Sequence, residues 1–270
     1  MFVPFIGLAV LLWPGPRATP APTLLAARSE HIASVRIGAG TVSAPDTLSS
    51  GWTRVRMSAD GPNHAPALFR LPAGVTRANL AAFLADLDTA AATPEGALSL
   101  GGRIAADSGE IIVDLAPGRY VVTCLTKDDG GHRHGIAGES RLLVVTRARA
   151  PTSPRPRASV SMRMTVFAYV GPDRWPAGSY LVRVENVGRQ DHQFRISRLP
   201  QGVTPAAVVR SADPRQLLTP VNGIGRMGPG VAYLPVRLAP GSYMLFCLVH
   251  DPATGQTHNK LGMYRLIEVR

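Results

Sequence analysis

The chain has 270 residues, of which 45% are hydrophobic, and its formal net charge is +11. This length predicts about two domains of ordinary size. The apolar fraction is high enough to form hydrophobic cores, which excludes an intrinsically disordered chain. Nearly all of the positive charge is arginine, but no basic helix or basic–aromatic strand is evident, so nucleic acid is not expected as a partner.

The chain begins with an apolar run, Met1–Trp13, followed by a Pro/Ala-rich segment. The run is too short to cross a bilayer, which takes about 20 apolar residues. It is typical of the core of a signal peptide. We therefore expect residues 1–27 to be a signal peptide or a disordered leader, and the protein to be exported to the periplasm or the extracellular space with no membrane span after leader removal. The alternative is a buried N-terminal strand.

Two segments of the chain occur twice, in the same order. FRLPAGVT at 69–76 matches SRLPQGVT at 197–204, and LAPGRYVVTC at 115–124 matches LAPGSYMLFC at 238–247. Such collinear matches indicate a duplicated domain. The Pro- and Arg-rich stretch 146–158 has no apolar period and is expected to be an extended linker. The predicted domains are therefore residues 28–145 and 159–270.

Within each copy the apolar pattern predicts strands. Residues 180–185 alternate apolar and polar side chains, as in a half-buried strand. Residues 243–249 form a continuous apolar run, which indicates a strand buried on both faces, and 263–269 form a last strand. Residues 120–125 and 141–145 are the counterparts in the first copy.

One short helix is expected in each copy. Thr76 is the predicted cap of a helix that carries four apolar residues on one face: Leu80, Phe83, Leu84 and Leu87. Thr204, followed by Pro205, is the equivalent start in the second copy. The fold class is therefore all-β, with two tandem β-sandwiches that each have a short inserted helix.

The repeat also pairs residues that can bind metal. In the second copy it selects His192, Cys247, His258 and Met263, and in the first His64, Cys124, His134 and Glu139. Two imidazoles, a thiolate and a weak axial thioether are the ligands of a type 1 copper centre. We therefore expect one copper ion in the second domain.

The second copy resembles the cupredoxins, the family of plastocyanin and azurin. The residues that carry the resemblance are Asn186-x-Gly188-x3-His192, Gly241-x-Tyr243-x3-Cys247 and His258-x4-Met263. The resemblance implies a Greek-key sandwich and one-electron transfer. It also implies that the edge of His258 lies near the surface, where a redox partner docks. The arginine excess of the second domain predicts an acidic partner, or else a solvated basic face.

Three points stay open from the sequence. His250 also has a plastocyanin-like spacing from Cys247, but Met263 is then too distant, so His258 is the preferred ligand. The first-domain set is either a second copper site with an axial carboxylate or a copy that has lost the metal. Cys124 and Cys247 are the only cysteines, but their matched positions in the repeat argue against a disulfide between them.

Two further functions compete with electron transfer. One is a copper-free cupredoxin-like module for binding or envelope scaffolding. The other is a two-domain copper oxidase or reductase, which needs a further copper centre built from additional histidines. The chain has seven histidines, and only His132-x-His134 forms a His-x-His pair, so an enzyme is the less favoured of the three.

Overall fold

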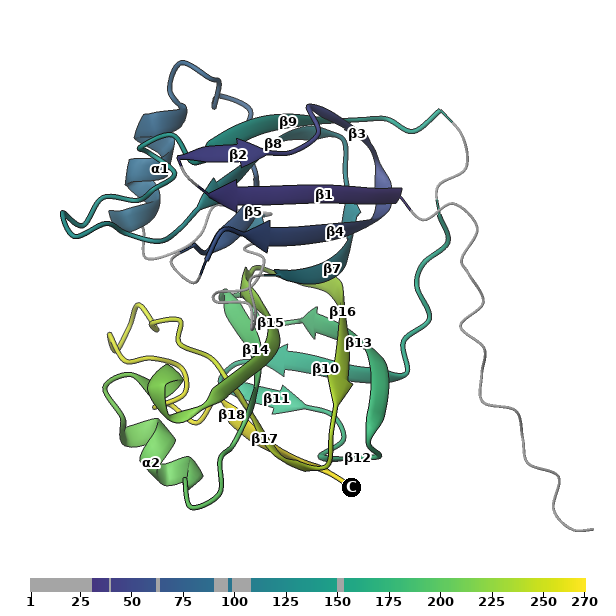
Figure 1. Cartoon of the computed structure of the whole chain (residues 1–270), viewed down its shortest axis with the longest axis vertical. Coiled ribbons are helices and arrows are strands. Elements are labelled where there is room, and N and C mark those ends of the chain that lie inside the picture. Colours follow the sequence, from purple (N-terminus) through teal and green to yellow (C-terminus); the bar gives the residue numbers. More distant parts are fainter. Residues whose placement is uncertain (1–30, 39, 62–63, 90–96, 99–107, 150–152) are drawn as a thin grey trace, which may run out of the picture.

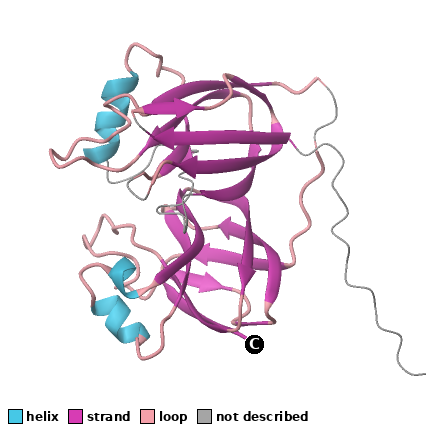
Figure 2. Ribbon diagram, viewed as in Figure 1, coloured by secondary structure: helices cyan, strands magenta, loops and turns pink. Residues whose placement is uncertain are grey.

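The structure is a computed structural model that describes the chain apart from residues 1–30, 39, 62–63, 90–96, 99–107 and 150–152 (Figure 1). The predicted leader, residues 1–27, lies outside the described residues. Strands dominate the described part, as Figure 2 shows. No helix in this part is long and apolar enough to cross a membrane.

The strands form two sheets that both run through the two halves of the chain. In spatial order, the first sheet consists of β11 (Ala168–Val170), β10 (Val160–Thr165), β13 (Gly178–Asn186), β16 (Gly230–Leu238), β7 (Ser108–Leu115), β4 (Gly51–Ala59), β1 (His31–Gly38) and β2 (Thr41–Ser43). The second consists of β12 (Arg174–Trp175), β18 (Tyr264–Val269), β17 (Gly241–Phe246), β14 (His192–Arg198), β15 (Thr219–Met227), β6 (Ala97–Leu98), β5 (Pro66–Arg70), β8 (Gly118–Cys124), β9 (Ser140–Thr146) and β3 (Thr47–Ser49).

The same pairings occur in both halves of the chain. In the N-terminal half β1 pairs in parallel with β4, and β8 pairs antiparallel with β5 and β9. In the C-terminal half β10 pairs in parallel with β13, and β17 pairs antiparallel with β14 and β18. The stretch between Thr146 and Val160, which contains the predicted linker, has no helix or strand among its described residues.

Each sheet passes from one half to the other by direct strand pairing. In the first sheet, Ala232 and Tyr233 of β16 pair with Val113 and Ile112 of β7. In the second, Met227 of β15 pairs with Leu98 of β6. The buried Tyr233 ring also packs against the Trp52 ring in a T-shaped arrangement, with ring centroids 5.2 Å apart. The predicted linker contacts the same boundary, since Arg155 Nε donates a hydrogen bond to the Tyr233 hydroxyl at 2.8 Å.

The main core lies between the two sheets, and the helices cover the outer face of the second sheet. Tyr243 and Leu245 of β17 point into the main core, whereas Met244 and Phe246 pack with Val208 of α2 (Pro205–Arg210). This alternation confirms that the apolar run is buried on both faces, but the strand is shorter than expected. It ends at Phe246, so that Cys247 lies just beyond it.

The two helix starts differ in how well the sequence predicts them. Thr204 caps α2 as expected, since its hydroxyl accepts a hydrogen bond from Ala207 N, and Pro205 follows it. The predicted cap at Thr76 is wrong, because α1 begins only at Leu80 and extends to Thr89. Instead, Asn79 holds the preceding turn, accepting a hydrogen bond from Thr76 N at 2.6 Å. Leu80 and Leu84 are buried as predicted, Phe83 is half-buried, and the Leu87 side chain lies outside the described residues.

Candidate metal centre

Three predicted ligands of the C-terminal half meet at one point. The Nδ1 atoms of His192 and His258 are 3.1 Å apart, and Cys247 Sγ is 3.5 Å from His258 Nδ1. A cation about 2.0 Å from each nitrogen and about 2.3 Å from sulfur, in a trigonal plane, would separate the two nitrogens by about 3.5 Å and each nitrogen from the sulfur by about 3.7 Å. The spacing is therefore close to that of a trigonal metal site.

The ends of three strands bring these residues together. His192 is the first residue of β14, Cys247 follows the last residue of β17, and Met263 precedes the first residue of β18. Met263 N donates to the carbonyl of His258 at 2.8 Å, and the Met263 carbonyl accepts from Cys247 N at 3.3 Å. The backbone of the predicted axial ligand is thereby tied to the backbones of two other ligands.

The residue after His192 supports the cysteine. Gln193 N donates to Cys247 Sγ at 3.3 Å, and Gln193 Oε1 accepts from Leu248 N at 3.1 Å. An N–H directed at the sulfur favours its charged thiolate form, because a hydrogen bond to the charged form stabilises it. The sequence does not reveal this role of Gln193, because its contribution is a backbone N–H that every residue except proline possesses.

The Asn186–Gly188 segment explains why glycine stands before the first histidine. Asn186 Oδ1 accepts from Gly188 N at 2.9 Å, which closes the turn, and Asn186 Nδ2 donates to Met227 O. A Cβ at position 188 would lie 3.1 Å from His192 Nε2. The glycine therefore leaves room for the imidazole, which accounts for this part of the predicted motif.

The long segment between Cys247 and His258 is a hydrogen-bonded hairpin. Asn259 N donates to Cys247 O, and His258 N donates to Val249 O at 2.8 Å. At the tip, Asp251 Oδ2 accepts from both the amide and the hydroxyl of Thr254. These bonds fold the intervening residues away and place His258 beside Cys247. His250 is exposed and lies outside the cluster, so His258 is the histidine that the structure brings to the site.

Burial keeps the metal-free site uncharged at neutral pH. His192, Cys247, His258 and Met263 are all fully buried. Burial lowers the pKa of His192 to about 4, with a further contribution from His258, and it also lowers the pKa of His258. It raises the pKa of the Cys247 thiol to about 11. Both imidazoles are therefore neutral and carry a free lone pair for a metal, whereas the thiol must lose a proton on binding.

The edge of His258, expected near the surface, is covered by the half-buried Phe167. His258 is fully buried, and the ring of Phe167 packs against it with centroids 5.0 Å apart. Phe167 lies in the turn between β10 and β11 and has φ of 53°, the one positive φ among described non-glycine residues. The left-handed region costs an L-residue roughly 1–2 kcal/mol, so packing of the ring must offset this strain.

Phe167→Gly should speed the loss of bound copper to an external chelator. An aromatic edge contact contributes up to about 1.5 kcal/mol, so openings that expose His258 should become roughly tenfold more frequent. The free energy of unfolding should change less, because glycine relieves the left-handed strain. Stopped-flow chelator kinetics measure the first effect and urea unfolding the second. Val166→Gly, at the neighbouring and 65% exposed position, is the control and should leave the kinetics unchanged.

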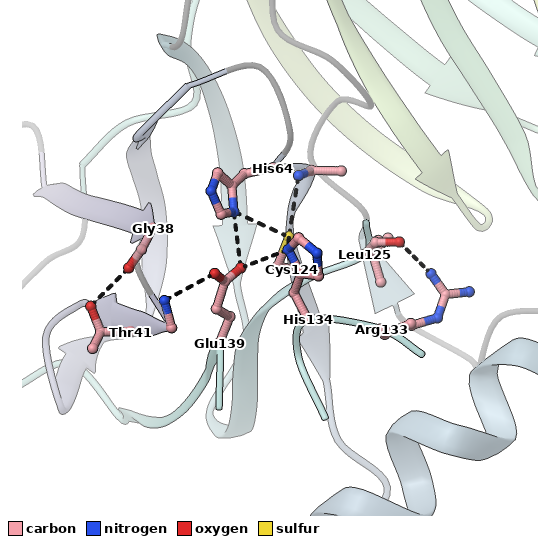
Figure 3. A network of polar contacts seen from close by, with 10 residues as sticks. Gly38, Thr41, His64, Cys124, Leu125, Arg133, His134 and Glu139 are labelled. Atoms are coloured by element: carbon pink, nitrogen blue, oxygen red, sulfur yellow. Dashed lines mark hydrogen bonds and ion pairs between the residues drawn. The ribbon is translucent and has the colours of Figure 1, made fainter. Parts of the chain in front are cut away.

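The first-half set also converges. His64, Cys124, His134 and Glu139 each bring one donor atom to within 4.8 Å of the others (Figure 3). Burial raises the pKa of the Cys124 thiol. For Glu139, burial alone would raise the pKa, but hydrogen bonds from Cys124 and His64 outweigh it and lower the pKa. Cys124 and Cys247 are both free thiols, so no disulfide joins them.

The donor set of the C-terminal cluster fits copper. A thiolate beside two imidazoles and a thioether suits copper in both oxidation states, since sulfur favours Cu(I) and imidazole binds either. The two Nδ1 atoms lie 3.1 Å apart between fully buried imidazoles, and both Nε2 atoms have no hydrogen-bond partner. A bound cation would satisfy both Nδ1 atoms together, and the candidate site is therefore that of a blue copper protein.

No family model matches the chain, and no curated protein matches its sequence. Among solved structures, dithionite-reduced auracyanin from Roseiflexus castenholzii is 21% identical, covers 41% of this chain and 94% of its own, and has a TM-score of 0.30. Auracyanin A of Chloroflexus aurantiacus, a "blue" copper protein, is 17% identical, covers 41% of this chain and 98% of its own, and has a TM-score of 0.27. A multicopper oxidase is 16% identical, covers 89% of this chain and 88% of its own, and has a TM-score of 0.25. Because these values are low, the metal assignment rests on the site's own geometry.

Proposed function

We propose that the protein is an exported copper protein in which residues 159–270 form a cupredoxin domain with a type 1 centre, and that it transfers one electron at a time. The observation that carries this proposal is the convergence of His192, Cys247 and His258 within 4.8 Å of one another at the ends of three strands. Met263 would supply the axial thioether, since it is fully buried and its backbone is bonded to Cys247 and His258. The repeated strand pairings support two tandem Greek-key sandwiches, with boundaries at 28–145 and 159–270.

Bound copper would supply a centre that alternates between Cu(I) and Cu(II). The protein residues hold the donor atoms in place. Gln193 N fixes the sulfur, the hairpin at 248–257 fixes His258, and Gly188 leaves room for His192. A preformed donor set inside a packed sandwich resists rearrangement when the metal changes its oxidation state, which favours electron transfer.

Cu(II) titration of the purified protein tests the proposal. A Cys124→Ala background removes the thiol of the first cluster, so that the C-terminal site is observed alone. We expect one equivalent of copper and an intense thiolate charge-transfer band that turns the protein blue. Adding Cys247→Ala should abolish the band, whereas adding His250→Ala should leave it unchanged, because His250 is exposed and outside the cluster.

A band that persists without the Cys247 thiol would contradict the assignment. Protein from copper-replete cells that holds no stoichiometric copper would instead favour the copper-free binding or scaffold module. Turnover of phenols or nitrite by the copper-loaded chain would favour an oxidase or reductase.

Export and partner choice are part of the same proposal. The apolar run Met1–Trp13 and the Pro/Ala-rich segment after it support a signal peptide, and fractionation of cells expressing the full chain tests for it. The arginine excess of residues 159–270 supports an acidic redox partner. Association with such a partner should weaken as salt is added, because charge steering is screened.

A further inference from the structure

The first-half cluster has the geometry of a site and differs from the C-terminal one in a single ligand. His64 Nδ1 lies 3.8 Å from Cys124 Sγ, and His134 Nδ1 lies 3.9 Å from it. Glu139 Oε2 is 3.0 Å from His64 Nδ1 and 3.4 Å from His134 Nδ1. Figure 3 shows the four side chains pointing toward one another.

The backbone places Glu139 where Met263 stands in the other half. Glu139 N donates to His134 O, and the Glu139 carbonyl accepts from Cys124 N at 3.0 Å. These are the two bonds that tie Met263 to His258 and Cys247. Ala65 N donates to Cys124 Sγ at 3.4 Å, as Gln193 N does to Cys247 Sγ. These three hydrogen bonds around the cysteine are therefore present in both halves of the chain.

One oxygen of Glu139 is held and the other faces the cluster. Oε1 accepts from Gly40 N at 3.2 Å, which leaves Oε2 toward the two imidazoles. The residue is 5% exposed, and a buried carboxylate calls for a cation or several hydrogen bonds.

The first cluster is also more open than the second. The side chains of His64 and His134 are 11% and 23% exposed, whereas His192 and His258 are fully buried. Gly40 occupies the place in the β1–β2 turn that Phe167 occupies in the β10–β11 turn, and both have positive φ, 75° and 53°. Position 40 therefore supplies no aromatic ring to cover the first cluster, as Phe167 does for His258.

We propose that His64, Cys124, His134 and Glu139 form a second copper site, in which Glu139 is an anionic ligand and Cu(II) is the favoured state. The thiolate and the carboxylate together bring two negative charges, against one in the C-terminal set. The added charge and the hard oxygen stabilise Cu(II) over Cu(I). The chain then carries two copper sites of different kinds: an open one that resists reduction and a buried one that accepts an electron readily.

Copper stoichiometry of single-site variants tests this proposal. After Cu(II) loading and dialysis, metal analysis should give two equivalents for the wild type, one for Cys247→Ala, one for Cys124→Ala and none for the double variant. Circular dichroism of each variant checks that the fold is intact. No copper in folded Cys247→Ala overturns the second site. No copper in folded Cys124→Ala counts against the C-terminal site instead, so the two failures are distinguishable.

The role of Glu139 is tested in the Cys247→Ala background by redox titration. Glu139→Met should shift the midpoint potential upward, because it removes a negative charge and restores the thioether of the other half. Glu139→Gln should also shift it upward while keeping an oxygen to accept from Gly40 N. If both variants titrate at the potential of their parent, Glu139 is not a ligand and the proposal fails.

Discussion

Replacing Phe194 with alanine should lower the free energy of unfolding of the copper-free protein by about 3–5 kcal/mol. Phe194 is fully buried in the main core, two residues after His192, and its ring contacts Tyr169 with centroids 5.9 Å apart. The loss combines the transfer energy of a large aromatic side chain with the cavity that it leaves. Urea unfolding followed by circular dichroism measures the change.

The effect should extend to the copper site. The Tyr169 hydroxyl donates a hydrogen bond to Gln193 O, and Gln193 N in turn holds Cys247 Sγ. A cavity at Phe194 therefore loosens the support of the thiolate, and copper should bind more weakly in the variant. Val166→Ala, at a 65% exposed position, is the control and should cost no more than about 0.5 kcal/mol. An equally small loss for Phe194→Ala would contradict the described core.

Acid should destabilise the copper-free protein by about 3 kcal/mol through His192 alone. The pKa of this histidine is about 4 in the folded protein, against an ordinary value of 6.5. Between these two pH values His192 is protonated in the unfolded chain but stays neutral in the folded protein. The stability contributed by His192 is therefore complete above pH 6.5 and is lost as the pH falls toward 4.

The comparison with His192→Gln isolates this contribution. Glutamine does not titrate, so its unfolding free energy should fall less than that of the wild type over the same pH range. Acid-sensitive groups outside this site, such as Glu139 with its lowered pKa, are present in both proteins and cancel in the difference. Parallel pH curves for the two proteins would mean that His192 is solvated, which contradicts its complete burial.

Most of the site residues can be predicted from the sequence, because the repeat allows the two halves of the chain to be compared with each other. Matched positions in the two copies pair Cys124 with Cys247, and His134 with His258. The choice of His258 over His250 follows from the spacing to Met263, and the hairpin that closes at Asp251 explains physically why ten intervening residues do not separate the ligands.

Other features could not be read from the sequence, because they depend on contacts between distant segments. Phe167 lies 91 residues before His258, and nothing local marks it as the cover of that imidazole. The joining of the sheets through Val113 and Ala232 depends on which strand edges are left free after each half has folded. The Thr76 cap failed for a different reason: Asn79 competes for the same turn, since its side chain bonds Thr76 N.

The pairing of β7 with β16, and of β6 with β15, has a consequence for the chain as a whole. A half produced by proteolysis or truncation would expose unpaired backbone N–H and C=O groups along these strands. Exposed sheet edges of this kind pair with strands of other polypeptides. Each half thus shields the other from intermolecular association. The two halves are therefore expected to unfold as one cooperative unit, with Tyr233 at the boundary between them.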